Sequence, residues 1–98
     1  MIYYIDIDNT ICKTEGSDYP NSQPYIDRIE KINQLYDAGH TIIYWTARGG
    51  RTGIIWDDLT EKQLQLWGCK YHSFYSGKPS YDIWIDDKAI NDKDFFES

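Results

Sequence analysis

The sequence predicts an α/β fold, a three-layer sandwich around a central parallel sheet of four or five strands. Short apolar segments alternate with segments of helical periodicity, which is typical of βαβ units and a parallel sheet. The first segment, Met1–Ile7, is apolar on both faces through Ile5, as in a strand buried within such a sheet. The chain has 98 residues. This length suits one domain, 1–98, because single domains cluster near ~100–150 residues.

The first half of the chain predicts two strands and one helix. Met1–Ile7 is the first strand, and the polar stretch Asp8–Gln23 is a loop long enough to suggest a function. After Pro24, apolar residues recur every three or four positions, which predicts a helix that Gly39 ends. Thr41–Trp45 predicts the second strand.

The second half continues the alternation. Thr60 and Gln63 match a capping box, so we expect a helix to begin there. Tyr71–Tyr75 and Tyr81–Ile85 predict a third and a fourth strand. Asn91–Phe96 predicts a short last helix or an edge segment.

Charge and composition exclude several classes of function. Ten basic and sixteen acidic residues give a net charge of −6, which argues against nonspecific binding to nucleic acids or anionic membranes. Cys12 and Cys69 lack the CxxC spacing of a zinc site and are too few for a disulfide framework. No apolar stretch approaches the ~18 residues of a membrane span, and the first residues lack the basic start of a signal peptide. We therefore expect a cytoplasmic protein with no membrane partner.

Residues with functional chemistry gather where the predicted strands end. They are Asp6 and Asp8 after the first strand, Thr46, Ala47 and Arg48 after the second, Lys78 before the fourth, and Asp86 and Asp87 at its end. Ligands of open α/β sheets bind outside the carboxyl ends of the strands. We therefore expect these residues to line one edge of the sheet.

So many acids at one edge require a cation. Two carboxylates ~4 Å apart repel by ~4 kcal/mol at an effective dielectric constant of ~20, and hard carboxylate oxygens suit Mg²⁺. A Mg²⁺ ion beside a lysine, a threonine hydroxyl and glycine-rich backbone amides would receive a phosphoryl group. An aspartate near its phosphorus can form an aspartyl-phosphate, while Asp8 protonates the leaving oxygen and later activates water.

The order of these motifs is that of a known group of enzymes. The segments YIDIDNTIC, IIYWTARG and GKPSYDIWIDDKAI resemble the four motifs of the haloacid dehalogenase-like (HAD) phosphohydrolase superfamily. The resemblance is to its small capless members, including those often labelled capsule-biosynthesis phosphatases, and it spans Ile2 to about Ile90. It implies a Rossmann-like, capless fold and a Mg²⁺-dependent phosphomonoester hydrolase acting on a phosphorylated metabolite, a sugar phosphate or a nucleotide.

The resemblance also implies the roles of single residues. Asp6 would be the nucleophile and a metal ligand, and Asp8 the general acid and base with its backbone carbonyl on the metal. Thr46 would bind the phosphoryl group, with Ala47 and Arg48 beside it. Lys78 would stabilise the charge of the phosphoryl group and hold the nucleophile.

Several points stay open at this stage. Of the acidic pair we favour Asp87 as the metal ligand and Asp86 as the partner of Lys78, and both remain candidate ligands. Arg48, Arg51 or neither contacts the substrate. The chain is too short to contain an inserted cap domain. The site is therefore expected to be covered by a large substrate, to be covered by a second subunit, or to stay open.

Two other functions compete with this hypothesis. Some capless relatives are polynucleotide 3′-end phosphatases, although the charge of −6 speaks against tight binding of a nucleic acid strand. A receiver-like signalling domain also combines paired aspartates, a threonine and a lysine around Mg²⁺. In receivers, however, the acceptor aspartate lies on a later central strand, a pattern that this sequence fits poorly.

Overall fold

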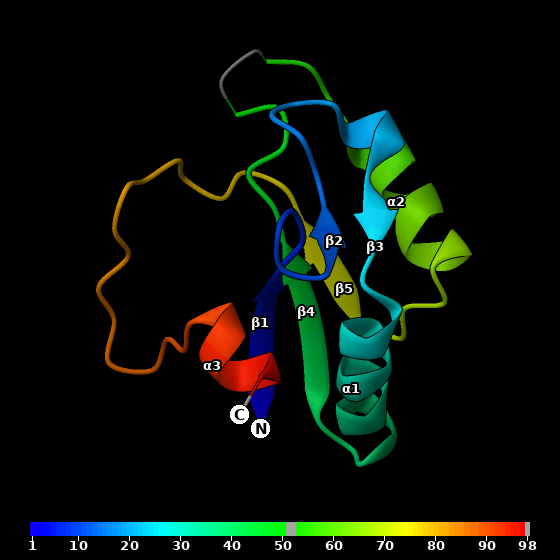
Figure 1. Cartoon of the computed structure of the whole chain (residues 1–98), viewed down its shortest axis with the longest axis vertical. Helices are drawn as coiled ribbons and strands as arrows, with labels where there is room; N and C mark the ends of the chain where they lie inside the picture. The colour runs from blue at the N-terminus through cyan, green and yellow to red at the C-terminus, as the bar shows by residue number, and fades with distance from the viewer. Residues whose placement is uncertain (51–52, 98) are drawn as a thin grey trace.

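The computed structural model of the chain describes residues 1–50 and 53–97. Its main sheet is parallel and has the strand order β1-β4-β5, with β1 at Ile2–Asp6, β4 at Thr41–Trp45 and β5 at Ser73–Tyr75 (Figure 1). The predicted α/β class is therefore confirmed. Within the described residues the parallel sheet has three strands, so the expectation of four or five was wrong.

The remaining elements are three helices and a small second sheet. Helix α1 spans Ile26–Asp37, α2 spans Asp57–Leu66 and α3 spans Asp92–Phe96. The loop after β1 contains the antiparallel strands β2 (Cys12–Lys13) and β3 (Gln23–Pro24). None of the helices in the described part of the chain has the length and apolar character needed to cross a bilayer.

The hydrophobic core lies on one face of the parallel sheet. Successive side chains of a strand point to opposite faces, so Ile5 of β1 and Tyr44 of β4, paired in register, share a face. Both are buried in one cluster with Ile29 and Ile32 of α1 and Leu64 of α2. The aromatic residues of α3 pack against the same cluster. The described helices thus cover a single face, which makes two layers instead of the predicted three.

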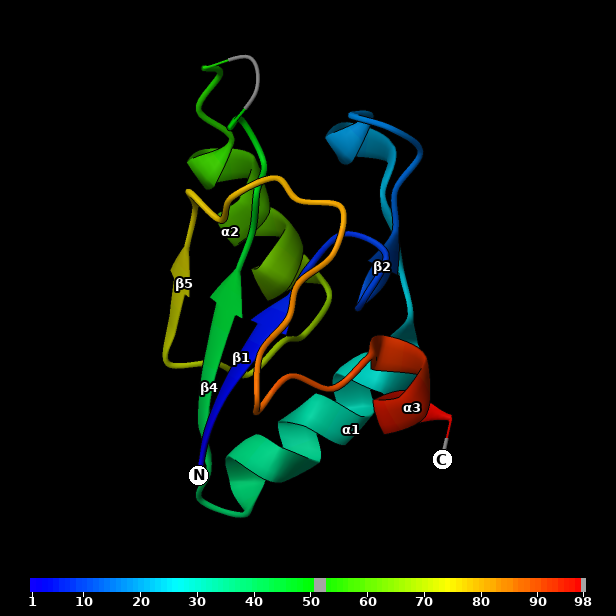
Figure 2. The ribbon, with the colours of Figure 1, turned by 90° about the vertical axis from the view of Figure 1, so that its left-hand side faces the viewer.

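The opposite face of the sheet is largely open. Ile2 and Tyr4 of β1 point to it and are 68% and 61% exposed. Strand β1 is also an edge strand, because β4 is its one neighbour in the described sheet. Figure 2 looks onto this open side, where the segment after β5 passes in front of β1.

The predicted end of α1 agrees with the structure, whereas the predicted start of α2 does not. Helix α1 ends just before Gly39, whose φ of 97° suits the glycine stop that the sequence predicts. Helix α2, however, begins at Asp57, so the capping box predicted at Thr60 and Gln63 was wrong. These two residues lie inside the helix with buried side chains, and both accept hydrogen bonds from Arg48.

The predicted strand Tyr81–Ile85 was also wrong. Residues 79–91, here called the arm, contain neither helix nor strand and run from the carboxyl end of the sheet to α3 (Figure 1). The backbone N–H of Lys78 donates to the carbonyl of Thr46 at 3.0 Å, which anchors the start of the arm at the carboxyl end. Parallel neighbours need a crossover of about a dozen residues or more, and two residues separate Lys78 from Tyr81.

Candidate active site

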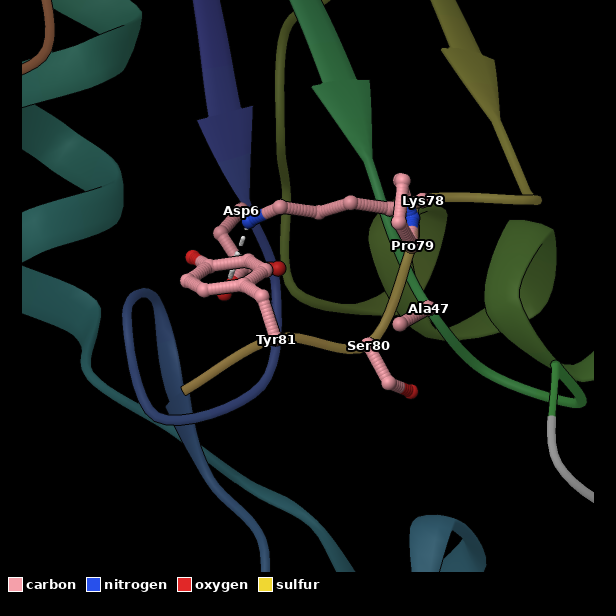
Figure 3. A pocket seen from close by; sticks show the side chains of 6 residues that line it. All are labelled: Asp6, Ala47, Lys78, Pro79, Ser80 and Tyr81. Atoms are coloured by element: carbon pink, nitrogen blue, oxygen red, sulfur yellow. Dashed lines mark ion pairs between the residues drawn. The ribbon is translucent and has the colours of Figure 1, made fainter. Parts of the chain in front are cut away.

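A pocket of about 420 Å³ lies at the carboxyl ends of β1 and β4 (Figure 3). Its lining residues are Asp6, Ala47, Lys78, Pro79, Ser80 and Tyr81. Three of these, from three separate segments of the chain, were predicted from the sequence as site residues: Asp6, Ala47 and Lys78. The predicted convergence at one edge of the sheet is therefore present for these three.

Asp6 and Lys78 form an ion pair inside the pocket. The Nζ atom of Lys78 lies 3.6 Å from Oδ2 of Asp6, while Oδ1 accepts a hydrogen bond of 2.9 Å from the N–H of Ile7. Burial raises the pKa of Asp6, and this effect outweighs the lowering by Lys78 and by the N–H of Ile7. The side chain of Lys78 is 12% exposed, and its ammonium lies within 6.0 Å of three ring centroids, those of Trp45, Tyr81 and Trp84.

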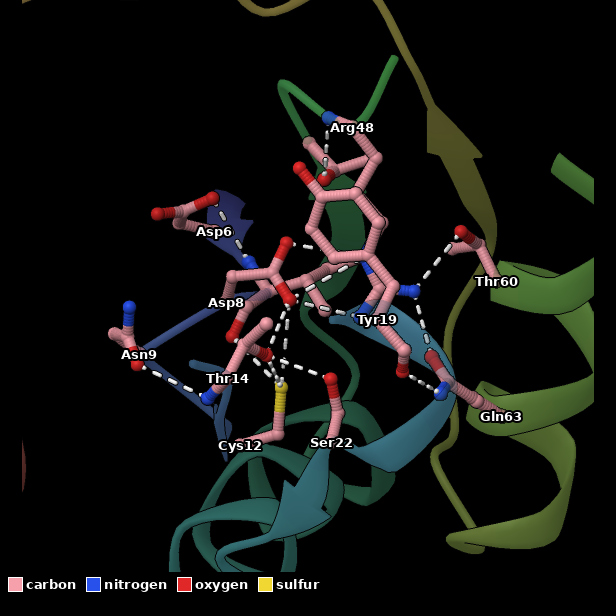
Figure 4. Close-up of polar contacts among 12 residues, drawn as sticks. Asp6, Asp8, Asn9, Cys12, Thr14, Tyr19, Ser22, Arg48, Thr60 and Gln63 are labelled. Carbon is pink, nitrogen blue, oxygen red and sulfur yellow. Dashed lines mark hydrogen bonds and ion pairs between the residues drawn. The ribbon is translucent and has the colours of Figure 1, made fainter. Parts of the chain in front are cut away.

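Asp8 lies beside Asp6 at the edge of a buried polar network (Figure 4). Two nitrogens of Arg48 donate to it, Nη2 to Oδ1 at 2.8 Å and Nε to Oδ2 at 3.0 Å and to Oδ1 at 3.3 Å. The hydroxyl of Thr14 donates to Oδ1 at 2.7 Å. The charge of Asp8 contributes to the raised pKa of Asp6. Three donor groups therefore hold the Asp8 carboxylate in one orientation.

Helix α2 holds Arg48 from the other side. Nη1 of Arg48 donates to Oγ1 of Thr60 at 3.2 Å and to Oε1 of Gln63 at 2.6 Å. The ring of Tyr19, in a short 3₁₀ turn at Tyr19–Asn21, lies 4.8 Å from the guanidinium carbon, and Nε2 of Gln63 donates to the carbonyl of Tyr19 at 2.6 Å. The Arg48 side chain is 1% exposed. It is neither a solvated loop arginine nor a lining residue of the pocket.

Thr46 is buried beneath the pocket and does not line it. Its Oγ1 accepts from the N–H of Arg48 at 3.2 Å, and its own N–H donates to the carbonyl of Tyr75 at 2.9 Å. The turn that follows depends on Gly49, which has a φ of 83°. A Cβ atom at this position would lie 2.0 Å from the carbonyl oxygen of Ile54. A glycine here lets the loop close tightly enough to direct Arg48 toward Asp8.

The acidic pair Asp86 and Asp87 lies in the arm, and neither residue lines the pocket. Both are exposed. Oδ1 of Asp86 accepts from the N–H of Lys88 at 2.8 Å, and this bond, helped by Asp87, lowers the pKa of Asp86. The cation expected to pair with Asp86, Lys78, pairs with Asp6 instead. The other arginine considered for substrate contact, Arg51, lies outside the described residues.

The described carboxylates do not fit a Mg²⁺ site as they stand. No group of three or more His, Cys, Asp or Glu side chains within residues 1–50 and 53–97 could hold a metal ion. Mg²⁺ requires near-octahedral oxygen coordination. Of the four predicted ligands, Asp6 alone lines the pocket. Asp8 was expected to bind the metal through its backbone carbonyl, and Arg48 occupies its carboxylate.

Sequence reasoning missed the residues that support Asp8. These are Thr14, Tyr19, Thr60 and Gln63. The signal for two of them was present, because residues three apart in a helix share a face and can bond to one partner. The same T-x-x-Q spacing also fits a helix start, and local sequence does not distinguish the two interpretations.

Comparisons with known proteins support the fold. No family model matches the sequence, and neither does any curated protein. The chain is similar to a crystal structure of an MCSG target from Vibrio cholerae, with 26% identity and a TM-score of 0.86. The match covers 99% of this chain and 88% of that chain. Nearly the whole of this chain therefore has a counterpart of closely similar fold. The comparison indicates no activity.

Proposed function

We propose that this protein is a phosphomonoester hydrolase of the HAD type, in which Asp6 forms an aspartyl-phosphate. Its substrate would be a small phosphorylated metabolite, a sugar phosphate or a nucleotide. The observation that carries the proposal is the Asp6–Lys78 ion pair inside an open pocket of about 420 Å³. A carboxylate beside an ammonium in such a pocket can approach a phosphorus atom while the cation offsets the phosphoryl charge.

The first step transfers the phosphoryl group to Asp6. Oδ2 of Asp6 attacks the phosphorus, and the bond between phosphorus and the ester oxygen breaks. The leaving oxygen takes up a proton and departs as an alcohol, and the HAD resemblance implies Asp8 as the donor of this proton. Lys78, 3.6 Å from Oδ2, neutralises part of the charge that gathers on the phosphoryl oxygens.

The second step releases phosphate. Asp8, now ionised, accepts a proton from a water molecule whose oxygen attacks the phosphorus, and the bond to Asp6 breaks. Inorganic phosphate leaves and the Asp6 carboxylate is restored. In this step the hydrogen bonds from Arg48 and Thr14 orient Asp8 toward the water.

A bound phosphate monoester would leave the pocket with more negative than positive charge. Among the described lining residues Lys78 is the one cation, and Asp6 is an anion. A phosphate monoester adds up to about two negative charges near neutral pH. The HAD resemblance implies Mg²⁺ for this purpose, but the described carboxylates do not hold it, so no step above depends on it.

The test is hydrolysis of an aryl phosphate near neutral pH, with and without Mg²⁺. We expect Asp6→Asn to abolish turnover and Asp8→Asn to slow it by about 10²–10⁴-fold. Asp37→Asn, which changes an aspartate of α1 outside the pocket, is the matched control and should retain wild-type turnover. Turnover retained by Asp6→Asn would refute the assignment of the nucleophile.

The same assay separates the two alternatives. A receiver-like domain would accumulate phosphoryl-Asp6 for minutes without turnover. A polynucleotide 3′-end phosphatase would act on phosphorylated oligonucleotides with a steep dependence on salt, since such binding releases counterions.

A further inference from the structure

Within the described residues the outer edge of β1 pairs with no strand, and the arm has aromatic contacts with its own chain, Trp84 to Trp45, but exposes its isoleucines. Strand β1 has β4 on one side and no described strand on the other. Within the arm, Ile83 and Ile85 are 78% and 92% exposed, and Ile90 is 66% exposed. An open strand edge is a template for pairing with another strand. Exposed apolar side chains clustered in one segment indicate a surface that is covered in the assembled protein.

The arm has the side-chain pattern of a strand that would fit this edge. If it lies parallel to β1 with Asp86 beside Asp6, Ile83 falls beside Tyr3 and Ile85 beside Ile5. Residues at the same level of neighbouring strands point to the same face. Tyr3 and Ile5 belong to the face that carries the core. This register therefore buries the two exposed isoleucines and brings an acidic pair to the carboxyl end of β1.

The arm of the same chain cannot adopt this register while Lys78 stays in the pocket. Lys78 is held at the carboxyl end by its bond to Thr46 and its ion pair with Asp6. Tyr81 would have to lie beside Met1, about 17 Å away along five residues of strand. The three peptide steps from Lys78 to Tyr81 span at most ~11 Å.

The arm of a second copy is free of this restriction. In Figures 1 and 2 the arm leaves the carboxyl end of the sheet and returns at α3, so it runs opposite to β1 of its own chain. A two-fold axis perpendicular to the strands reverses the direction of the partner chain. The partner's arm then runs parallel to this β1, as the register requires.

We propose that two copies of this chain exchange arms. The segment Tyr81–Ile85 of each copy adds a strand to the outer edge of β1 of the other. Asp86 and Asp87 of one copy thereby reach Asp6 and Asp8 of the other, so each pocket is built from both chains. The exchange itself rests on the geometry above, and its consequence for activity rests on the proposed function.

The exchange would bring Asp86 and Asp87, the predicted metal ligands that do not line the pocket of a single chain, to the pocket of the partner. In one chain Asp86 and Asp87 are exposed, and no described group could hold a metal ion. In the exchanged dimer three carboxylates, those of Asp6, Asp86 and Asp87, meet beside Lys78. Such a cluster needs a cation, and hard oxygen donors select a divalent ion such as Mg²⁺. We expect the dimer to bind Mg²⁺ more tightly than the single chain, because the exchange adds two carboxylates to the pocket.

The first test measures molar mass by sedimentation equilibrium. We expect the wild-type protein to have twice the mass of one 11.6 kDa chain. Ile83→Ser should weaken the dimer by about tenfold or more, because it replaces a side chain that the exchange buries. Ile55→Ser is the matched control, since Ile55 is 84% exposed but lies outside the arm, and this variant should stay dimeric. A monomeric wild type, or an Ile83→Ser dimer as tight as the wild type, would overturn the proposal.

The second test mixes two inactive variants, Asp6→Asn and the double variant Asp86→Asn/Asp87→Asn. In a mixed dimer with exchanged arms, one pocket combines Asp6 of one chain with Asp86 and Asp87 of the other. Random mixing would restore about one quarter of the wild-type activity and of the Mg²⁺ binding. If the wild type is active and the mixture recovers neither activity nor Mg²⁺ binding, the exchange of arms is refuted. A dimer that responds as expected to Ile83→Ser but never hydrolyses phosphate esters would refute the proposed function alone.

Discussion

Two nitrogens of Arg48 hold Asp8, with Nη2 donating to Oδ1 at 2.8 Å and Nε donating to Oδ2 at 3.0 Å. The other terminal nitrogen of Arg48 bonds to Thr60 and Gln63 of α2. One guanidinium thus joins the loop after β1, the loop after β4 and helix α2. The position of Asp8 next to Asp6, the proposed nucleophile, depends on a side chain that does not line the pocket.

Arg48→Met should destabilise the fold. It removes the guanidinium that donates to Asp8, Thr60 and Gln63 and leaves Asp8 with the Thr14 hydroxyl but no cation. Breaking a buried pair costs about 3–5 kcal/mol. Asp8 is 20% exposed, so we expect the lower end of that range in urea unfolding. Lys70→Met is the control, because the Lys70–Asp37 pair is exposed and such pairs contribute about 0–1 kcal/mol. Equal losses in the two variants would contradict the central role of Arg48.

The stability of the wild type relative to Asp6→Asn should fall as pH rises. Burial raises the pKa of Asp6 above the reference value of 3.8. The folded state therefore binds the proton more tightly than the unfolded state, and ionisation of Asp6 costs folding free energy. This contribution to stability is fully present below pH 3.8 and is lost as pH rises through the raised pKa. Thermal melts of both proteins between pH 4 and pH 7 measure it, and a constant difference in Tm would contradict the raised pKa.

Lys78→Met should shift the acid limb of the rate profile to higher pH. Lys78 lowers the pKa of Asp6, so its removal raises that pKa further and Asp6 becomes a carboxylate only at higher pH. We also expect kcat/KM for an aryl phosphate to fall by about 10²–10³-fold, the effect of losing one preorganised charge donor. Lys62→Met is the control, because it changes an exposed lysine of α2 that lies outside both the arm and the pocket. This variant should keep the wild-type acid limb.

Gly49→Ala should cost more stability than Gly16→Ala. Both glycines have positive φ, 83° and 55°, so each alanine carries a backbone penalty of about 1–2 kcal/mol. At Gly49 the new Cβ would also lie 2.0 Å from the carbonyl oxygen of Ile54, whereas nothing lies within 4 Å at Gly16. Urea unfolding of the two variants isolates the cost of this contact. The larger loss at Gly49 should be accompanied by slower turnover, because the displaced loop carries Arg48.

Part of the geometry of the candidate site could be predicted from the sequence for a physical reason. Strand ends and motif order placed Asp6, Ala47 and Lys78 at one edge of the sheet, and these three line the pocket. The support of Asp8 was not predictable in this way. Arg48 reaches it from forty positions along the chain, and nothing local indicates which acid a loop arginine will meet.

The amino-acid sequence by itself determined β1, β4, α1 and the class of the fold. Apolar periodicity and the glycine stop at Gly39 act between near neighbours in the chain, so they can be recognised without coordinates. Tertiary structure alone decided the state of Tyr81–Ile85 and of the T-x-x-Q pair in α2. A strand exists only when another strand pairs with it. Lys78 is bonded to Thr46 and Asp6 at the carboxyl end of the sheet, so Tyr81–Ile85 cannot pair in parallel with β1 of its own chain. Thr60 and Gln63 likewise face Arg48 because the packing of α2 turns them inward.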